Sequence, residues 1–280
     1  MERKPEYLLE TYDTENPEFI SIFDELPLWS APFGRVLLDT VKLKKNINAL
    51  DIGFGTGFPM IEIAQRVGQS SKVFGLDLNE AMYDRVDLKL KQCKIRNVHI
   101  KYGSAESQPF ENDFFDLIVS NNGINNVSNQ DKAMNECFRT LKKDGQMVLT
   151  MNLPDTMKPF YNVFEKVLQS LGKLKEIEKM KEHIRSKRKS DEENKVMIKN
   201  AGFQIAEIKL DEFFLRYVDG STFLNHFLIT FAFLPSWRDI LDKSDVPLVF
   251  PVLENELNKL TEAKGELKLP IPFACYDCIK

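Results

Sequence analysis

Between residues 47 and 151 the chain alternates short apolar runs with segments in which apolar residues recur at helical spacing. The apolar runs are 47–52, 72–77, 97–102, 114–120 and 146–151, and the helical patterns occupy 58–67, 79–94 and 129–142. This alternation predicts parallel strands joined by helical crossovers. The run FFDLIVS at 114–120 is apolar at almost every position, which is typical of a strand covered on both faces.

Outside this region the pattern is mainly helical. Two proline-separated helices are expected before residue 45, helices over 156–189 and 190–201, a strand at FQIAEIKL, and two more helices in 221–241 and 249–260. Pro270 and Pro272 would restrict a final strand to an edge or a bulged place. We therefore expect four segments: a helical cap (1–45), a core (46–152), a helical lid insertion (153–189), and a remainder of the core with additional helices (190–280).

Composition excludes several classes of function. The chain has 280 residues, 29% of them charged, and a net charge of −4, so it lacks the basic footprint of a nucleic-acid binder. No apolar run reaches the roughly 18 residues of a membrane span, and the N-terminus MERKPEYLLE has no signal-peptide stretch. We expect a cytoplasmic protein with no membrane or nucleic-acid partner. The four scattered cysteines contain a single CxxC, so no metal site is expected.

The stretch NALDIGFGTGFPMIEIA, residues 48–64, contains the candidate chemistry. Gly53, Gly55 and Gly57 lie between a strand and a helix, where backbone can approach a ligand without a Cβ in the way. The Gly-Lys-Ser/Thr of a phosphate-binding loop is absent, and Phe58 stands where a dinucleotide fingerprint has its third glycine. Asp51 would repel a pyrophosphate but would attract the ammonium and sulfonium of S-adenosylmethionine. The acid therefore favours the sulfonium cofactor.

A second acid, Asp77, ends the next strand, 24 positions after Gly53. Nucleoside-binding α/β folds place a carboxylate there on the ribose hydroxyls, although a plain helix cap before Asn79 is an alternative.

The chain resembles class I S-adenosylmethionine-dependent methyltransferases in four segments, in order: ALDIGFGTGFPMIEIA, VFGLDLN, KYGSAESQPFENDFFDLIVSNNGI and CFRTLKKDGQMVLT. The resemblance covers residues 48–151. It implies an α/β, Rossmann-like, doubly wound and mostly parallel seven-stranded sheet, with 46–152 as the cofactor-binding core. It also implies that the three glycines contact the methionine part of the cofactor, Asp77 the ribose, and Leu78 the adenine. Ser104, Ala105 and Glu106 would lie at the adenine amine.

Within the class the pattern is closest to small-molecule enzymes such as quinone-biosynthesis and arsenite methyltransferases. The cysteines do not follow the arsenite arrangement. Ser120-Asn121-Asn122-Gly123 replaces the Asn/Asp-Pro-Pro-Tyr of enzymes that methylate nucleic-acid bases.

Methyl transfer from a sulfonium is an in-line displacement that depends on alignment and exclusion of water, so no catalytic base is required by the pattern. Asn121 is expected at the cofactor, and Asn125 at the substrate, because both follow the fourth strand. His226 and Tyr161 are further candidates near the reacting groups. Trp29 is expected to close the site, together with Phe33.

Three alternatives stay open at this point. They are an NAD(P)-dependent oxidoreductase, a methyltransferase that acts on RNA or protein, and a cofactor-binding module without catalysis. The sequence identifies neither the methyl acceptor nor the choice between monomer and homodimer.

Overall fold

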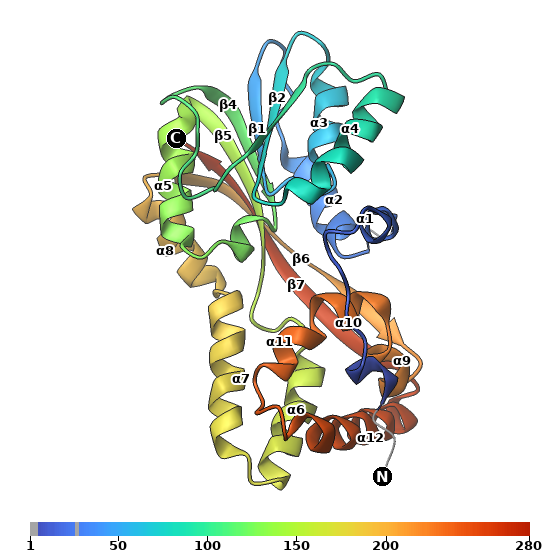
Figure 1. The fold of residues 1–280 in the computed structure, drawn as a ribbon. Helices are drawn as coiled ribbons and strands as arrows, with labels where there is room; N and C mark the ends of the chain where they lie inside the picture. Colours follow the sequence, from blue (N-terminus) through green and yellow to red (C-terminus); the bar gives the residue numbers. More distant parts are fainter. Residues whose placement is uncertain (1–4, 26–27) are drawn as a thin grey trace. The chain divides into compact units, whose positions relative to one another are not determined.

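The computed structural model describes residues 5–25 and 28–280 (Figure 1). Its described residues form two compact units. The sheet unit comprises Asp13–Leu153, Lys189–Asp211 and Phe273–Lys280, and the helical unit comprises Met1–Tyr12, Pro154–Arg188 and Glu212–Pro272. The division into four segments at 45, 152 and 189 stays a prediction.

The sheet has seven strands in the order β3-β2-β1-β4-β5-β7-β6. In that order they are Val98–Tyr102, Lys72–Asp77, Asn48–Ile52, Phe115–Asn121, Leu141–Asn152, Leu267–Ile279 and Gln204–Tyr217. The β1–β2, β1–β4, β2–β3 and β4–β5 pairs are parallel, while β7 is antiparallel to β5. This confirms the expected doubly wound, mostly parallel sheet, in which the strand order reverses at β1 and β4.

Helices cover both faces of this sheet. In Figure 1, α2 (Ser30–Thr40), α3 (Met60–Val67) and α4 (Tyr83–Gln92) lie on one face, and α5 (Gln130–Thr140) and α8 (Asp191–Asn200) on the other. Burial on both faces explains the apolar run in β4, where every residue from Leu117 to Ser120 is buried.

Side-chain caps set where several of these helices begin. Asn16 accepts a hydrogen bond from the Glu18 amide at the start of α1 (Pro17–Asp24), and Asn129 accepts one from Lys132 at the start of α5. Ser190 and Glu193 form a reciprocal capping box that starts α8. These contacts satisfy amide groups that have no partner inside the helix.

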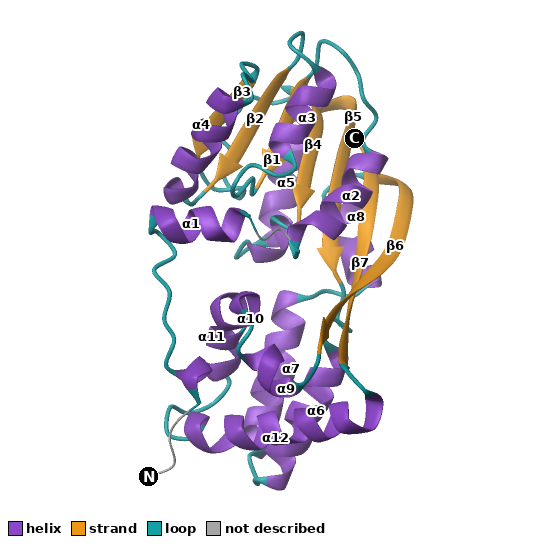
Figure 2. Cartoon of the chain, turned by 90° about the vertical axis from the view of Figure 1, so that its right-hand side faces the viewer, coloured by secondary structure: helices purple, strands orange, loops and turns teal. Residues whose placement is uncertain are grey.

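The helical unit contains η1 (Glu6–Leu8), α6 (Lys158–Ser170), α7 (Leu174–Lys187), α9 (Gly220–Leu224), α10 (Phe227–Ala232), α11 (Leu234–Arg238) and α12 (Val246–Lys264) (Figure 2). Its core is aromatic: Trp237 and Phe160 stack at 4.1 Å between ring centroids, and Phe223 and Phe164 are fully buried beside them. Within the described residues, no helix combines the length and apolar character that crossing a bilayer requires.

Two expected helices are broken in the structure. The helical pattern over 156–189 divides into α6 and α7 at Gly172, whose φ of +70° ends the first helix. The stretch 221–241 forms three short helices, because the chain is extended at His226 and Pro235 begins a new first turn at α11.

The proline-containing tail was expected at an edge or a bulged place of the sheet, and its strand is not an edge strand. β7 lies between β5 and β6, so β6 is the edge strand. The paired register between β5 and β7 runs only from Phe273 to Ile279 on β7. Pro270 and Pro272 precede that stretch, so their missing N–H groups remove no hydrogen bond to β5.

Candidate functional site

The glycine loop joins β1 to α3 at the point where the strand order reverses. Gly53, Gly55 and Gly57 all have positive φ, at +75°, +52° and +106°. A Cβ on Gly53 would lie 2.9 Å from the Cα of Gly123, and one on Gly57 would lie 2.6 Å from Ile61 Cδ1. A Cβ on Gly55 would meet nothing within 4 Å. Gly53 is thus needed for close packing against backbone and Gly57 for its φ of +106°, whereas Gly55 faces open space.

Asp77, at the end of β2, is bonded to this loop. One carboxylate oxygen accepts a hydrogen bond from the Gly55 amide at 2.9 Å, and the other accepts from the Asn79 amide at 2.9 Å. Asn79 itself supplies the cap of η2 (Glu80–Met82) through its side chain. Asp77 is therefore more than a helix cap, and each of its oxygens keeps a lone pair for a further donor. The neighbouring Leu78 is 59% exposed, which is unusual for a leucine beside a strand end.

Asp51, near the end of β1, is fully buried. Neither of its carboxylate oxygens has a hydrogen-bond partner among the described residues. Burial raises the pKa of Asp51 to about 8, the amide of Met60 acts to lower it, and the negative charge of Asp77 raises it further. A buried acid without a partner is costly unless a positively charged group compensates it.

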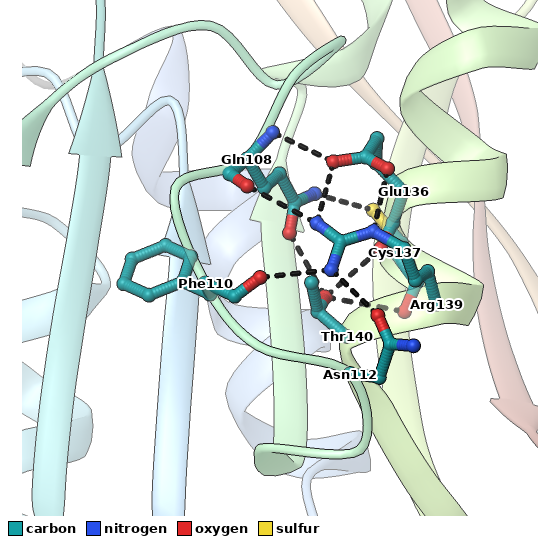
Figure 3. Close-up of polar contacts among 7 residues, drawn as sticks. All are labelled: Gln108, Phe110, Asn112, Glu136, Cys137, Arg139 and Thr140. Atoms are coloured by element: carbon teal, nitrogen blue, oxygen red, sulfur yellow. Dashed lines mark hydrogen bonds and ion pairs between the residues drawn. The ribbon is translucent and has the colours of Figure 1, made fainter.

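A network of polar contacts holds the loop after β3 against α5 (Figure 3). The Arg139 guanidinium donates to the carbonyl of Gln108 at 3.1 Å and to that of Phe110 at 2.8 Å. It also pairs with Glu136 at 2.7 Å, and this hydrogen bond lowers the pKa of the Glu136 carboxyl. Thr140 Oγ1 donates to the Gln108 side chain at 2.9 Å. The loop that carries residues 104–106 is therefore anchored at its far end.

The expected adenine-contacting residues lie in that loop. Ser104 Oγ accepts a hydrogen bond from the Glu106 amide at 3.1 Å, and the Glu106 carboxylate accepts one from the Asn129 amide at 2.9 Å. Ala105 is buried. These contacts fix the backbone between β3 and α5, and they leave one Glu106 oxygen available.

The comparisons with known proteins identify the family. The model of the ubiE/COQ5 methyltransferase family matches residues 6–212. The chain belongs to this family. It is similar to a demethylmenaquinone methyltransferase of Lactobacillus johnsonii, with 30% identity over 59% of this chain and 70% of the relative. It also matches the ubiquinone/menaquinone biosynthesis C-methyltransferase UbiE of Psychromonas ingrahamii, with 33% identity over 50% of this chain and 58% of the relative.

Solved structures agree on the fold of this methyltransferase. A SAM-dependent methyltransferase from Aquifex aeolicus superposes with a TM-score of 0.55 at 15% identity, covering 96% of this chain and all of the other. The protein is thus an S-adenosylmethionine-dependent methyltransferase with a Rossmann-like fold. The oxidoreductase alternative finds no support.

Two observations support binding of this cofactor at the glycine loop of the methyltransferase. Gly55 faces open space, and the buried Asp51 carboxylate has no partner. The cofactor carries an ammonium and a sulfonium, so a negative charge beside the loop is complementary to it. The residue roles expected from the sequence stay predictions.

A clasp formed by α1 and α4 was not foreseen from the sequence. The Asp24 carboxylate binds Arg85 at 2.6 Å and also Lys89, and Lys89 donates to the Thr56 carbonyl of the glycine loop at 2.7 Å. Burial acts to raise the pKa of Asp24, but hydrogen bonds from Lys89, Thr56 and Arg85 outweigh it, so the pKa is lowered. Opposite charges 61 and 65 residues apart give no local signal in the sequence.

The asparagines after β4 form contacts with each other and with neighbouring elements. The Asn121 amide donates to the Ser30 carbonyl at 3.0 Å and accepts from Thr150 at 3.1 Å, so it holds the start of α2. The Asn125 amide group donates to Asn122 at 2.7 Å and to Asn152, while its oxygen is buried without a partner. Asn125 thus keeps an acceptor for a further group, and Asn121 serves packing in addition to any contact with the cofactor.

The other expected residues lie elsewhere. Trp29 is the N-cap residue of α2, with its ring 5.5 Å from that of Phe33. Tyr161 and His226 belong to the helical unit. The backbone of His226 caps α10, its Nδ1 is buried without a partner, and burial lowers its pKa. Their roles in the reaction stay predictions.

We expect Gly55→Val to abolish binding of S-adenosylhomocysteine, because the new side chain would fill the space that Gly55 leaves open. Gly68→Val is the matched control: Gly68 also has positive φ, at +72°, and also meets nothing within 4 Å, but it ends α3 away from the loop. Both positions have positive φ, where valine is strained, so circular dichroism should first confirm that both variants fold. Calorimetry should show lost binding in the first and unchanged binding in the second. Equal affinity in both variants would place the ligand elsewhere.

The raised pKa of Asp51 predicts a pH dependence of cofactor affinity. Below about 8 the free protein holds a proton on this carboxyl. A cationic ligand favours the ionised form, so affinity should rise by up to about tenfold per pH unit until it levels above that value. Asp51→Asn should remove this rise and weaken binding at high pH by about 1–3 kcal/mol. Calorimetry from pH 6 to 9 tests this, and identical pH profiles would refute it.

The same carboxyl affects folding stability. Its pKa is raised above the ordinary 3.8, so its ionisation opposes folding, and its stabilising effect is complete at low pH and lost as pH rises toward about 8. The ligand-free Asp51→Asn variant should therefore gain stability relative to the wild type as pH increases over this range. Chemical denaturation at several pH values measures the difference.

Proposed function

We propose that this methyltransferase binds S-adenosylmethionine at the glycine loop of the sheet unit and transfers the methyl group to a small aromatic acceptor. The observation that carries the proposal is a buried, unpartnered carboxylate, Asp51, beside a loop whose middle glycine faces open space. The family match supplies the class of reaction.

Different residues of the proposed site contact different parts of the cofactor. Gly53, Gly55 and Gly57 contact the methionine part through backbone, and Asp51 compensates its positive charge. Asp77 accepts hydrogen bonds from the ribose hydroxyls with the lone pairs left by Gly55 and Asn79. Leu78, exposed beside it, offers an apolar surface to the adenine ring. Ser104, Ala105 and Glu106 provide polar groups for the adenine amine, and Asn121 and Trp29 border the same cofactor.

The protein contributes alignment to the reaction. When bound, the cofactor supplies an electrophilic methyl group on sulfur. The fixed loop and the α1–α4 clasp hold the backbone that orients it, and burial of Asp51 keeps water from the charge. Asn125 offers its unpartnered oxygen to a hydroxyl of the acceptor. Tyr161 and His226 remain the other candidates for proton handling.

The acceptor is proposed from the names of the relatives, which methylate quinone precursors. We infer a planar, largely apolar ring with a phenolic oxygen, methylated at carbon. Residues 213–280 lie beyond the family match, so differences in acceptor are expected to arise there. The net charge of −4 disfavours RNA as the acceptor, because phosphate contacts require basic surface. We further propose a cytoplasmic enzyme, consistent with its four free thiols.

Incubation with S-adenosylmethionine labelled in its methyl group tests the acceptor class. With a short-chain demethylmenaquinol as substrate, we expect label in the organic extract and a new ring C-methyl group by mass spectrometry and NMR. Gly55→Val should abolish transfer and Gly68→Val should retain it. RNA and protein from a cell extract serve as competing acceptors. Label that precipitates with either of them, with none in the extract, would overturn the proposal.

A further inference from the structure

Arg188, the residue that caps the C-terminus of α7, is a buried cation without a counter-charge. It is only 6% exposed, and its Nη1 has no hydrogen-bond partner among the described residues. No carboxylate of residues 5–25 or 28–280 pairs with its guanidinium. The guanidinium carbon lies 5.4 Å from the centroid of the Tyr161 ring, so an aromatic face is its contact.

Other half-buried cations in the chain pair with carboxylates, unlike Arg188. Arg85 and Arg139 have side chains 22% and 32% exposed, and each pairs with a carboxylate at 2.6–2.7 Å. Lys173, 31% exposed, pairs with Asp245 at 2.6 Å. Arg188 is more deeply buried than any of these three. A cation–π contact compensates only part of the desolvation of a buried charge, so the free protein retains Arg188 at a cost to stability.

The charges around the end of α7 are mixed: Lys187 is positive, and Asp239 is a carboxylate that acts on His183. His183, on the same helix, has its pKa lowered to about 4 by burial and by the charges of Arg188 and Lys187, with Asp239 opposing. Its imidazole is therefore neutral at physiological pH. The Tyr161 hydroxyl accepts a hydrogen bond from Trp237 Nε1 at 3.0 Å, so its own proton is available to an acceptor.

We propose that the helical unit binds a small aromatic carboxylate, with Arg188 as its charge partner. A planar guanidinium offers parallel N–H donors that match the two oxygens of a carboxylate. The Arg188 guanidinium balances one negative charge. Phe160 and Trp237, stacked beside Tyr161, make the neighbourhood aromatic. Arg188 is not among the residues assigned to the cofactor or to the methyl acceptor, whereas Tyr161 is a candidate in both sites.

Substitution of Arg188 distinguishes a role in binding the carboxylate from a role in the stability of the fold. Arg188→Met keeps an unbranched apolar stem but is shorter than arginine, and it removes the guanidinium together with its charge. Arg185→Met is the matched control, since Arg185 lies on the same helix, is 73% exposed and pairs with Glu182 at 3.3 Å. Both are made in the otherwise unaltered chain, which serves as the background protein and keeps both tryptophans, because Trp29 belongs to the proposed cofactor site.

Thermal unfolding is then followed by far-UV circular dichroism with benzoate, benzamide or inorganic phosphate. We expect benzoate, and not the neutral benzamide, to raise the Tm saturably by a few degrees in the background protein and in Arg185→Met, but not in Arg188→Met. Without ligand, Arg188→Met should unfold at the same or a higher temperature than the background protein, because it removes an uncompensated charge.

Three results would overturn the proposal. One is equal stabilisation of Arg188→Met by benzoate. Another is the absence of a benzoate effect on the Tm of the background protein, and a lower Tm of ligand-free Arg188→Met would then make Arg188 a structural residue. The third is greater stabilisation by phosphate than by benzoate, which would overturn the carboxylate assignment. Binding of S-adenosylhomocysteine to each variant is measured in parallel, so failure of the glycine-loop site is seen separately.

Discussion

The close approach of the glycine loop to its neighbours is the constraint on which the site depends. Gly53 lies against the backbone of Gly123 across the β1–β4 switch point, and Gly55 donates its amide to Asp77 at 2.9 Å. The loop is thereby held between two strands of the sheet while one face stays open. A side chain at Gly53 would push the loop away from the Gly123 backbone.

Ion pairs and hydrogen bonds of charged residues, between positions distant in sequence, hold the segments around this loop in place. Arg139 fixes the segment after β3 to α5, and Asp24 with Lys89 fixes α1 to the loop carbonyl of Thr56. Both arrangements satisfy their charges inside the protein. A satisfied pair of this kind stabilises one geometry, which a displacement reaction needs for alignment.

Two buried ionisable groups depart from this arrangement. Asp51 and Arg188 are each more than nine-tenths buried, and no opposite charge among the described residues pairs with them. They belong to different units and have opposite sign. Retaining such groups costs stability, and this cost is typical of residues kept for a ligand. The first fits a cationic cofactor, and the second fits an anionic small molecule.

The sequence by itself determined the core of the sheet and the class of enzyme. Apolar runs, glycine spacing and the acids at 51 and 77 are local patterns, because strands, turns and strand ends are set by residues close in sequence. Tertiary structure alone decided that β7 is an inner strand, that Arg139 and Lys89 anchor the loops, and that Asp51 and Arg188 have no partner. Burial and pairing depend on residues that are distant along the chain, so no local pattern records them.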